Sequence, residues 1–391
     1  MNRTKAKVCL GVSGLLVFMM LLSGCDPGLL PIPLPIRFPA QGPHFLYVVN
    51  SISTSISGFS IDSTSGALTS VGPAVPTGDG SIYAVATENG KFLYVANAEE
   101  DASNVSAYRI NPKTGVLTPT TPATFPVTGD GQPFGIVVDP SSTHVYTANA
   151  GSISAFRIDP ITGNLSNVPG TPVSTGNVEP QNLTLTPNGQ FLYVTYGLTN
   201  QVAAYTLNSA GLPQAKGRPV ATGEFPIGIV VDPGGRFAYV ANWISNDVSR
   251  YVITPGTGVL VPAGTTSVGA GCEPQELVVD PSARFLYVTC PGLSNIAQFA
   301  INPQSGALTA VDSPLATGLA TEPRGIAVDA SGKFVYSALN TANRIGVAEI
   351  GLTGTLKLTT DSPGTKNGPL GVAIANPQSD VRWGAADSSG D

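Results

Sequence analysis

Few side chains in this chain of 391 residues could carry acid–base, nucleophilic or metal chemistry. There are two histidines and four cysteines, which are His44, His144, Cys9, Cys25, Cys272 and Cys290. Their spacing matches no metal-binding motif, and the chain has neither a phosphate-binding glycine loop nor a Gly-x-Ser-x-Gly nucleophile turn. We therefore expect no metal and no cofactor, and any chemistry must rest mainly on acidic and basic side chains.

The first 24 residues are typical of an export signal. Arg3, Lys5 and Lys7 precede an apolar run from Val8 to Leu22, which is shorter than the roughly 20 residues that a membrane-spanning helix needs. The run ends in Leu22-Ser23-Gly24-Cys25, which resembles the bacterial lipobox. This resemblance implies cleavage before Cys25 and a lipid on Cys25, hence a lipoprotein of the bacterial cell envelope, periplasmic or surface-exposed. An ordinary secretory signal with a chance cysteine is the alternative.

The flanking segments and the charge complete this picture. Residues 25–44 are rich in proline and predict an extended linker, whereas the polar residues 377–391 predict a disordered tail. The net charge is −6, and removing the three signal cations leaves 16 basic and 25 acidic side chains, a charge of −9. Such a body offers no surface for nucleic acid. We expect a monomer held to the membrane through Cys25.

The elements that must position any site follow from a repeat. An aromatic strand motif recurs with its tyrosines about 46 to 52 residues apart, a period typical of β-propeller blades. The copies are Phe45–Val48, Phe92–Val95, His144–Thr147, Phe191–Val194, Phe237–Val240, Phe285–Val288 and Phe334–Ser337. Residues 45–376 therefore predict an all-β, seven-bladed β-propeller of four-stranded blades.

The two ends of the repeat predict how the ring closes. The first unit begins at its second strand, Phe45–Val48, with no inner strand before it. The last inner strand, Pro369–Ala375, has no second strand after it. The C-terminal strand should therefore complete the first blade, which removes the exposed sheet edges of an open ring.

In such propellers, the loops that enter the inner strands and the loops between second and third strands share one face. Acidic side chains gather in these loops, at Glu99, Glu100, Asp101, Asp130, Glu179, Glu224, Glu273, Glu276 and Glu322. They could attract a cation or a basic ligand, or they could be an ordinary solvated surface. Asparagine ends the second strand in four blades, but Tyr196, Cys290 and Leu339 replace it in the others. These departures could mark a specialised mouth or simple drift of the repeat.

Candidate ligand-binding residues at this mouth are Tyr196, Trp243, Glu273 and Glu322. Trp243 could stack on a sugar or an aromatic ligand, or could simply cap its blade. Cys272 lies just before an inner strand, and Cys290 ends the strand that runs back along it. The two cysteines should therefore lie close together, and outside the cytoplasm a disulfide between them would persist.

The repeats resemble the YVTN-repeat and lactonase families of seven-bladed propellers. The resemblance is carried by Phe92–Asn97 and by the turn Asn111–Leu117, and it covers residues 45 to about 376. The lactonase branch includes 6-phosphogluconolactonase and muconate-cycloisomerase-like enzymes. It implies lactone ring opening or closure without a metal, by glutamate, histidine and arginine side chains at the mouth of the channel.

This chain retains only some of the catalytic side chains that the resemblance implies. Glu276 keeps the glutamate of the family, and Pro323-Arg324 keeps its arginine, but Gly325 stands where histidine is expected. The loop Cys290–Leu293 lacks the arginine and histidine of the family, and Pro180–Asn182 replaces a histidine-rich entry. His144 occupies a slot that is phenylalanine in the other blades, so we expect it to pack rather than react.

Two functions remain open from the sequence. The first is a lipid-anchored binding or interaction scaffold with degenerate catalytic residues, which presents the channel mouth to a small molecule or a protein. The second is a lactonase in which Glu276 activates water and Arg324 stabilises the oxyanion. A tight pocket that holds both side chains and raises the pKa of the glutamate would favour the enzyme, whereas an open polar funnel would favour the scaffold.

Overall fold

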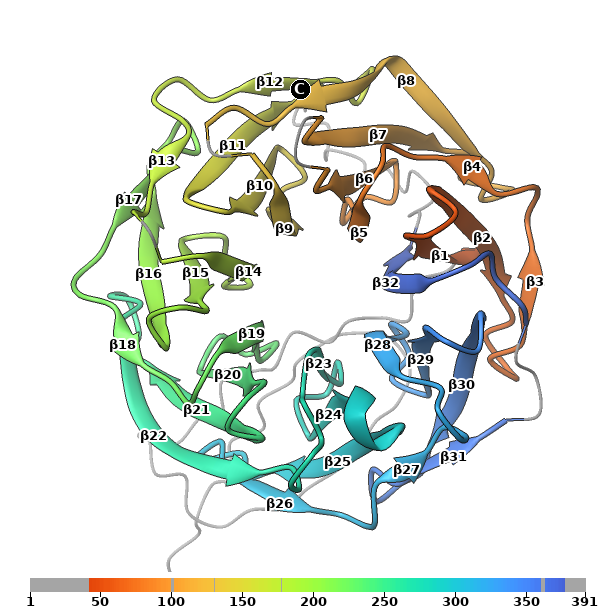
Figure 1. Ribbon diagram of the computed structural model, residues 1–391, viewed down its shortest axis with the longest axis vertical. Coiled ribbons are helices and arrows are strands. Elements are labelled where there is room, and N and C mark those ends of the chain that lie inside the picture. Colours follow the sequence, from red (N-terminus) through yellow and green to blue (C-terminus); the bar gives the residue numbers. More distant parts are fainter. Residues whose placement is uncertain (1–41, 100–101, 130, 177, 360–362, 377–391) are drawn as a thin grey trace, which may run out of the picture. The chain divides into compact units, whose positions relative to one another are not determined.

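The computed structural model describes residues 42–376 except 100–101, 130, 177 and 360–362. Within this part of the chain, seven antiparallel sheets are arranged as blades around a common centre (Figure 1). The predicted all-β, seven-bladed propeller is therefore confirmed. The predicted signal peptide, residues 25–41 of the predicted linker, and the predicted tail lie outside the described residues. In the part that the structure describes, no helix is long and apolar enough to cross a membrane.

Each blade has an inner strand near the centre, two middle strands and an outer edge. The first blade contains β32 (Pro369–Ala375), β1 (His44–Asn50), β2 (Ser55–Ile61), β3 (Leu68–Ser70) and β4 (Val75–Pro76). The second blade contains β5 (Ser81–Ala86), β6 (Phe92–Asn97), β7 (Asn104–Ile110) and β8 (Leu117–Pro126). The third blade contains β9 (Pro133–Val138), β10 (His144–Asn149), β11 (Ser152–Ile158), β12 (Leu165–Asn167) and β13 (Val173–Ser174).

The fourth blade contains β14 (Pro180–Leu185), β15 (Phe191–Tyr196), β16 (Gln201–Leu207), β17 (Pro213–Ala215) and β18 (Val220–Ala221). The fifth blade contains β19 (Pro226–Val231), β20 (Phe237–Asn242), β21 (Asp247–Ile253) and β22 (Leu260–Ser267). The sixth blade contains β23 (Leu277–Val279), β24 (Phe285–Cys290), the short 3₁₀ helix η1 (Pro291–Leu293), β25 (Asn295–Ile301), β26 (Leu308–Ala310) and β27 (Leu315–Ala316). The seventh blade contains β28 (Pro323–Val328), β29 (Phe334–Leu339), β30 (Arg344–Ile350) and β31 (Leu356–Leu358).

The C-terminal strand closes the ring, as the sequence predicted. β32 pairs antiparallel with β1, with Phe45 opposite Ala375 and Asn50 opposite Pro369. Figure 1 shows the blue β32 beside the red β1. The first blade is therefore built from both ends of the propeller, and neither end leaves an inner strand unpaired.

The repeated aromatic motif joins each blade to the next. In six blades, the motif tyrosine donates its hydroxyl hydrogen to the carbonyl of a glycine in the next blade's turn between third strand and outer edge. Tyr47 donates to Gly115 at 2.7 Å, and Tyr336 of the seventh blade donates to Gly66 of the first at 3.2 Å. The glycines of these turns have positive φ, which glycine adopts without steric cost.

The phenylalanine of the motif packs against the same glycine turn, and His144 takes this place in the third blade. A β-carbon on Gly211 would lie 2.5 Å from the imidazole carbon Cδ2 of His144, as one on Gly66 would from the ring of Phe334. His144 also lies 2.9 Å from the hydroxyl of Thr143 and 3.6 Å from the carboxylate of Asp139. It therefore packs between two blades, as the sequence predicted.

The strand directions define two faces of the propeller. We call the face that carries the loops into the inner strands and the loops between second and third strands the mouth face. β1 ends and β32 begins at the mouth face, so β1 begins and β32 ends on the opposite face. The inner segment of each blade opens at the mouth face with a serine or proline, which is the first residue of the inner strand except in the sixth blade, where Pro274 precedes β23 by three residues. The residue directly before this serine or proline has positive φ in every blade; these residues are Gly80, Gln132, Glu179, Phe225, Glu273, Glu322 and Gly368.

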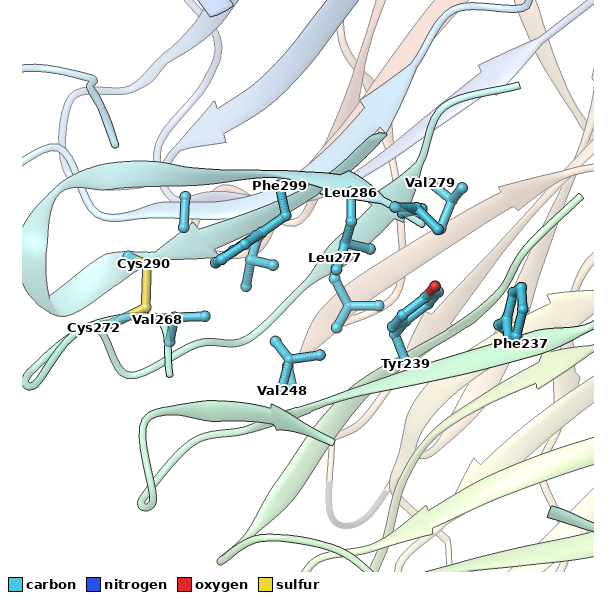
Figure 2. Close-up of a cluster of buried hydrophobic side chains, with 14 residues drawn as sticks. Phe237, Tyr239, Val248, Val268, Cys272, Leu277, Val279, Leu286, Cys290 and Phe299 are labelled. Carbon is cyan, nitrogen blue, oxygen red and sulfur yellow. A yellow bond between two sulfur atoms is a disulfide. The ribbon is translucent and has the colours of Figure 1, made fainter. Parts of the chain in front are cut away.

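Apolar side chains of neighbouring blades pack face to face between the sheets. Figure 2 shows the cluster between the fifth and sixth blades, where Tyr239 and Val248 meet Leu277 and Leu286. At the mouth end of this cluster, Cys272 and Cys290 are joined by a disulfide, with 4.4 Å between their α-carbons. Both cysteines are fully buried, so the disulfide is part of the core and connects the loop into the sixth blade to the end of β24.

Candidate functional site

One position of the inner strand segments alternates in size around the ring. It lies two residues after the serine or proline that opens each segment. From the first to the seventh blade it holds Gly371, Tyr83, Gly135, Asn182, Gly228, Glu276 and Gly325. Glycine therefore occupies the first, third, fifth and seventh blades, and larger polar side chains occupy the second, fourth and sixth.

The three larger side chains meet across the centre of the ring. The hydroxyl of Tyr83 donates to Oε1 of Glu276 at 2.6 Å. The side-chain amide of Asn182 donates to the same oxygen at 2.9 Å. Three blades that are not neighbours are thereby connected through one carboxylate oxygen.

Two of the glycines show why the ring is narrow enough for this contact. A β-carbon on Gly228 would overlap the carbonyl oxygen of Gln275, and the backbone N–H of Gly228 donates to that oxygen at 3.0 Å. A β-carbon on Gly325 would overlap the carbonyl oxygen of Leu370 and lie 2.9 Å from the backbone nitrogen of Val372. Glycine at these positions lets adjacent inner segments approach backbone to backbone.

Two buried threonines fix the backbone that carries the polar side chains. The Thr289 hydroxyl accepts a hydrogen bond from the N–H of Glu276 at 3.0 Å, and the N–H of Thr289 donates to the carbonyl of Glu276 at 2.9 Å. The hydroxyl of Thr195 accepts from the N–H of Asn182 at 3.1 Å. At the equivalent position the other blades carry valine or alanine, so this support is confined to the blades of Glu276 and Asn182.

A cavity of about 180 Å³ lies beside the three side chains. Its lining combines polar groups with two aliphatic side chains and consists of Ile82, Tyr83, Gln275, Glu276, Arg324, Gly325 and Leu370. These residues open the inner segments of the second, sixth, seventh and first blades, so the cavity lies toward the mouth face. Glu276 and Arg324, the two catalytic candidates of the sequence, share its wall.

The surroundings of Glu276 shift the pKa of its carboxyl toward neutrality. Burial raises this pKa from its usual 4.5 to about 7, although the hydrogen bonds from Tyr83 and Asn182 lower it in part. Burial, followed by the charge of Glu276, raises the pKa of the Tyr83 hydroxyl well above 10, while Arg324 acts in the opposite direction. The phenol therefore stays protonated, and the carboxyl can both accept and release a proton near pH 7.

Arg324 brings a positive charge to the same cavity. Its Nη2 lies 3.2 Å from Oε2 of Glu322, two residues earlier. Its Nε is buried and has no hydrogen-bond partner within the described residues. Glu322, a ligand-binding candidate of the sequence, therefore holds the guanidinium, while Arg324 keeps donor capacity for another group.

The histidine expected at Gly325 cannot be restored by a side-chain change alone. Because β32 of the first blade lies directly against Gly325, any side chain there would displace backbone. Glycine at this position therefore matches the close backbone contact between the seventh and first blades. Neither described histidine lines the cavity.

The other three ligand-binding candidates lie outside the cavity. Tyr196 is buried in the core between blades, where its hydroxyl is hydrogen-bonded to that of Tyr205, so it is not exposed at the mouth as we expected. Trp243 packs edge-on against Phe225, with 5.5 Å between the ring centres. Glu273 is exposed at the rim, and its backbone N–H donates to Asn246 at 2.9 Å.

Several of the described acidic side chains in the mouth loops are exposed. Glu99, Glu224 and Glu273 are exposed, whereas Glu100, Asp101 and Asp130 lie outside the described residues. Across the described ranges, no group of three or more potential metal ligands lies together. The solvated-surface interpretation accounts for the exposed members, and Glu276 and Glu322 stand apart from them.

Tyr83 and Asn182 were missed as site residues. Each looks unremarkable within its own repeat, because it is one polar residue in a β-strand. The signal was the alternation with glycine at one aligned position, together with threonine after the motif in Phe191–Thr195 and Phe285–Thr289.

Comparison with known proteins agrees with this architecture. The family model described as "Lactonase, 7-bladed beta-propeller" matches residues 48–372. The periplasmic gluconolactonase of Pseudomonas aeruginosa is 22% identical with a TM-score of 0.72, covering 85% of this chain and 99% of that one. A candidate 6-phosphogluconolactonase of Bacteroides uniformis is 21% identical with a TM-score of 0.73, covering 86% and 100%. At these identities the likeness concerns the fold alone. No curated protein matches the chain.

Proposed function

The chain belongs to the seven-bladed β-propeller lactonase family, and from this premise we propose that it hydrolyses a lactone in the cavity between Glu276 and Arg324. The observation that carries the proposal is the shared cavity, in which burial brings the pKa of Glu276 to about 7. A tight pocket with a raised glutamate pKa was the criterion that separates an enzyme from a scaffold. It favours the enzyme over the scaffold.

Glu276 supplies the proton transfers of this reaction. Its carboxylate takes a proton from water while the water oxygen attacks the carbonyl carbon of the lactone. The bond between that carbon and the ring oxygen then breaks, and the protonated carboxyl returns the proton to the leaving ring oxygen. Lactone and water give a hydroxy acid, and Glu276 ends as it began. A group with a pKa near the working pH suits both steps.

Arg324 stabilises the charge that develops on the carbonyl oxygen. The guanidinium is held by Glu322 and faces the same cavity as Glu276. A preorganised cation in a partly desolvated site favours the oxyanion over the neutral carbonyl, which lowers the barrier. Removing one such donor typically costs about 10² to 10³ in turnover.

The cavity suggests the size of the substrate. A volume of about 180 Å³ corresponds to roughly six water molecules in the liquid, which suits a single small ring. Ile82 and Leu370 offer aliphatic contact to ring carbons, and Gln275 offers an amide to a ring substituent. Glucono-δ-lactone and 6-phosphogluconolactone are the first compounds to test, since two structural neighbours carry names that refer to these substrates.

A binding role without turnover is the second candidate. This role is supported by the absence of both described histidines from the cavity lining. Among the described lining residues, Glu276 is then the only group with a pKa near neutrality that could act as a base. We further propose that the protein works at the cell envelope through a lipid on Cys25, which the lipobox-like Leu22–Cys25 supports.

The test is a hydrolysis screen with the two lactones, following acid release at constant pH. We expect the parent to open at least one ring, and Glu276→Gln and Arg324→Ala to lose most of the activity. Glu349→Gln, an exposed glutamate of β30 far from the cavity, is the matched control and should retain it. Activity that survives both cavity substitutions would assign the reaction elsewhere. Lactone binding without turnover by the parent would favour the binding role.

A further inference from the structure

The two oxygens of the Glu276 carboxylate have different surroundings. Oε1 accepts hydrogen bonds from both Tyr83 and Asn182. Oε2 accepts none from the described residues, and it is not among their buried atoms that lack a partner. Since Glu276 lines the cavity, Oε2 is the oxygen that opens toward it.

We propose that Tyr83 and Asn182 are positioning residues that hold Glu276 by Oε1 and so make Oε2 the oxygen that exchanges protons with water and with the lactone. This inference rests on the proposed lactonase function and deepens it. Two donors on one oxygen fix the rotation of the carboxylate about its last bond, which is otherwise broad. Only one orientation then presents a lone pair to the cavity.

The same arrangement decides where the proton sits in the acid form. Oε1 already accepts two hydrogen bonds, so protonation there would require one donor to leave. The proton therefore resides on Oε2, where it faces the ring oxygen that departs in the second step. One carboxyl thus serves as base and then as acid without rotating.

Asn182 is itself held by neighbouring groups. The Oδ1 of Asn182 accepts the N–H of Leu183 at 2.8 Å, so the amide is oriented with its N–H₂ toward Glu276. The hydroxyl of Thr195, which accepts from the backbone of Asn182, donates to the carbonyl of Ile227 at 2.7 Å. This network ties the Asn182 backbone to the fifth blade, which lies between Asn182 and Glu276.

Among the described residues that line the cavity with Glu276, the titratable or charged ones are Tyr83 from the second blade and Arg324 from the seventh. Glu322 forms an ion pair with Arg324. A neutral donor to a carboxylate favours its ionised form. Removing the Tyr83 hydroxyl should therefore make Glu276 harder to ionise and also free its rotation.

The deciding variant is Tyr83→Phe, which removes one oxygen and preserves the ring. We expect kcat to fall about 10-fold or more with KM little changed, and the pH at half-maximal kcat to move upward. Asn182→Ala should act in the same direction. Tyr108→Phe is the matched control, because it also removes a phenol hydroxyl from the second blade. The Tyr108 hydroxyl donates to the carbonyl of Pro76 at 2.6 Å and not to Glu276. It should leave both kinetic readouts unchanged.

A second readout does not depend on activity. Difference infrared spectra of the parent and of Tyr83→Phe, each taken against its own Glu276→Gln counterpart, report the protonated carboxyl of Glu276 as pH rises. A higher titration midpoint in Tyr83→Phe supports the inference, and an unchanged midpoint overturns it even if no lactone is hydrolysed. Unchanged kcat and pH profile in Tyr83→Phe, alongside an inactive Glu276→Gln, would overturn the positioning role and leave the lactonase proposal standing.

Discussion

Gly325 and Leu370 approach so closely that a β-carbon on Gly325 would overlap the carbonyl oxygen of Leu370. This contact joins the inner strand of the seventh blade to that of the first, next to Arg324. It explains why the expected histidine is missing, since β32 occupies the space that a side chain would need.

We predict that Gly325→Ala lowers the free energy of unfolding by about 1–3 kcal/mol, the usual cost of overpacking a rigid contact. Gly325→His should be less stable still and should gain no lactonase activity. Chemical denaturation of each variant measures the loss. Gly364→Ala is the control, because the nearest atom to a β-carbon there is 3.9 Å away. Wild-type stability of Gly325→His would contradict the packing described.

Glu276 should make the stability of the protein depend on pH. Burial raises its pKa in the folded protein to about 7 from 4.5, so the folded state binds its proton more tightly than the unfolded chain does. The resulting stabilisation is complete below pH 4.5 and is lost as pH rises through 7, a change of roughly 3 kcal/mol. Glu276→Gln should lack this loss. Parallel pH curves for parent and variant, from denaturation between pH 4.5 and 8, would be inconsistent with the shift.

Closure by the C-terminal strand can be tested by truncation. A chain that stops before Pro369 lacks β32, so β1 loses its inner partner and presents an unpaired edge. We expect aggregation or a large fall in melting temperature. A chain that stops after Asn376 retains β32 and serves as the control. Equal solubility and melting temperature for the two chains would refute the closure.

The disulfide should be detectable by peptide mapping under non-reducing conditions, as a linked pair containing Cys272 and Cys290. The cysteines are separated by 18 residues, so replacing both with alanine should cost at most about 3 kcal/mol of unfolding free energy in the chain-entropy model. Thermal denaturation compares the variant with the parent. Two free thiols in protein taken from the envelope would argue against the link in the native protein.

Attachment through Cys25 remains a prediction from the sequence. Cys25→Ser should abolish lipid labelling and release the protein from the membrane fraction or leave its signal uncleaved. Metabolic labelling with a fatty acid, followed by fractionation, measures both effects. Labelling and membrane partitioning equal to those of the parent would exclude this cysteine as the anchor.

The fold was predictable because each blade repeats the same sequence pattern. The Phe-x-Tyr pattern predicts the second strand, the glycines predict the turns, and the unpaired strands at the two ends predict how the ring closes. The meeting of Tyr83, Asn182 and Glu276 was not predictable from any single repeat. It depends on the distance across the ring, which is set by the backbone contacts of glycines in other blades.

The departures from asparagine at the end of the second strand illustrate the same limit. Asn50 donates to the hydroxyl of Ser57 at 3.0 Å, and the other three asparagines contact equivalent serines. Where asparagine is lost, the serine position is alanine or glycine. In the fourth blade, the hydroxyl of Tyr196 is hydrogen-bonded to that of Tyr205. In the sixth, Cys290 forms the disulfide with Cys272. In the seventh blade, the side chain of Leu339 packs against Gly346. None of these three residues lines the cavity.

The start of β1 and the end of β32 lie together on the face opposite the mouth, where Nδ1 of His44 and Oδ1 of Asn376 are 2.5 Å apart. A chain segment joined to either end of the propeller therefore leaves it from the face opposite the mouth face. The chain that leads from Cys25 to His44 therefore joins the propeller on the face opposite the cavity. For the same reason, the body could be coupled to a solid support or a fusion partner through either end with its entrance unobstructed.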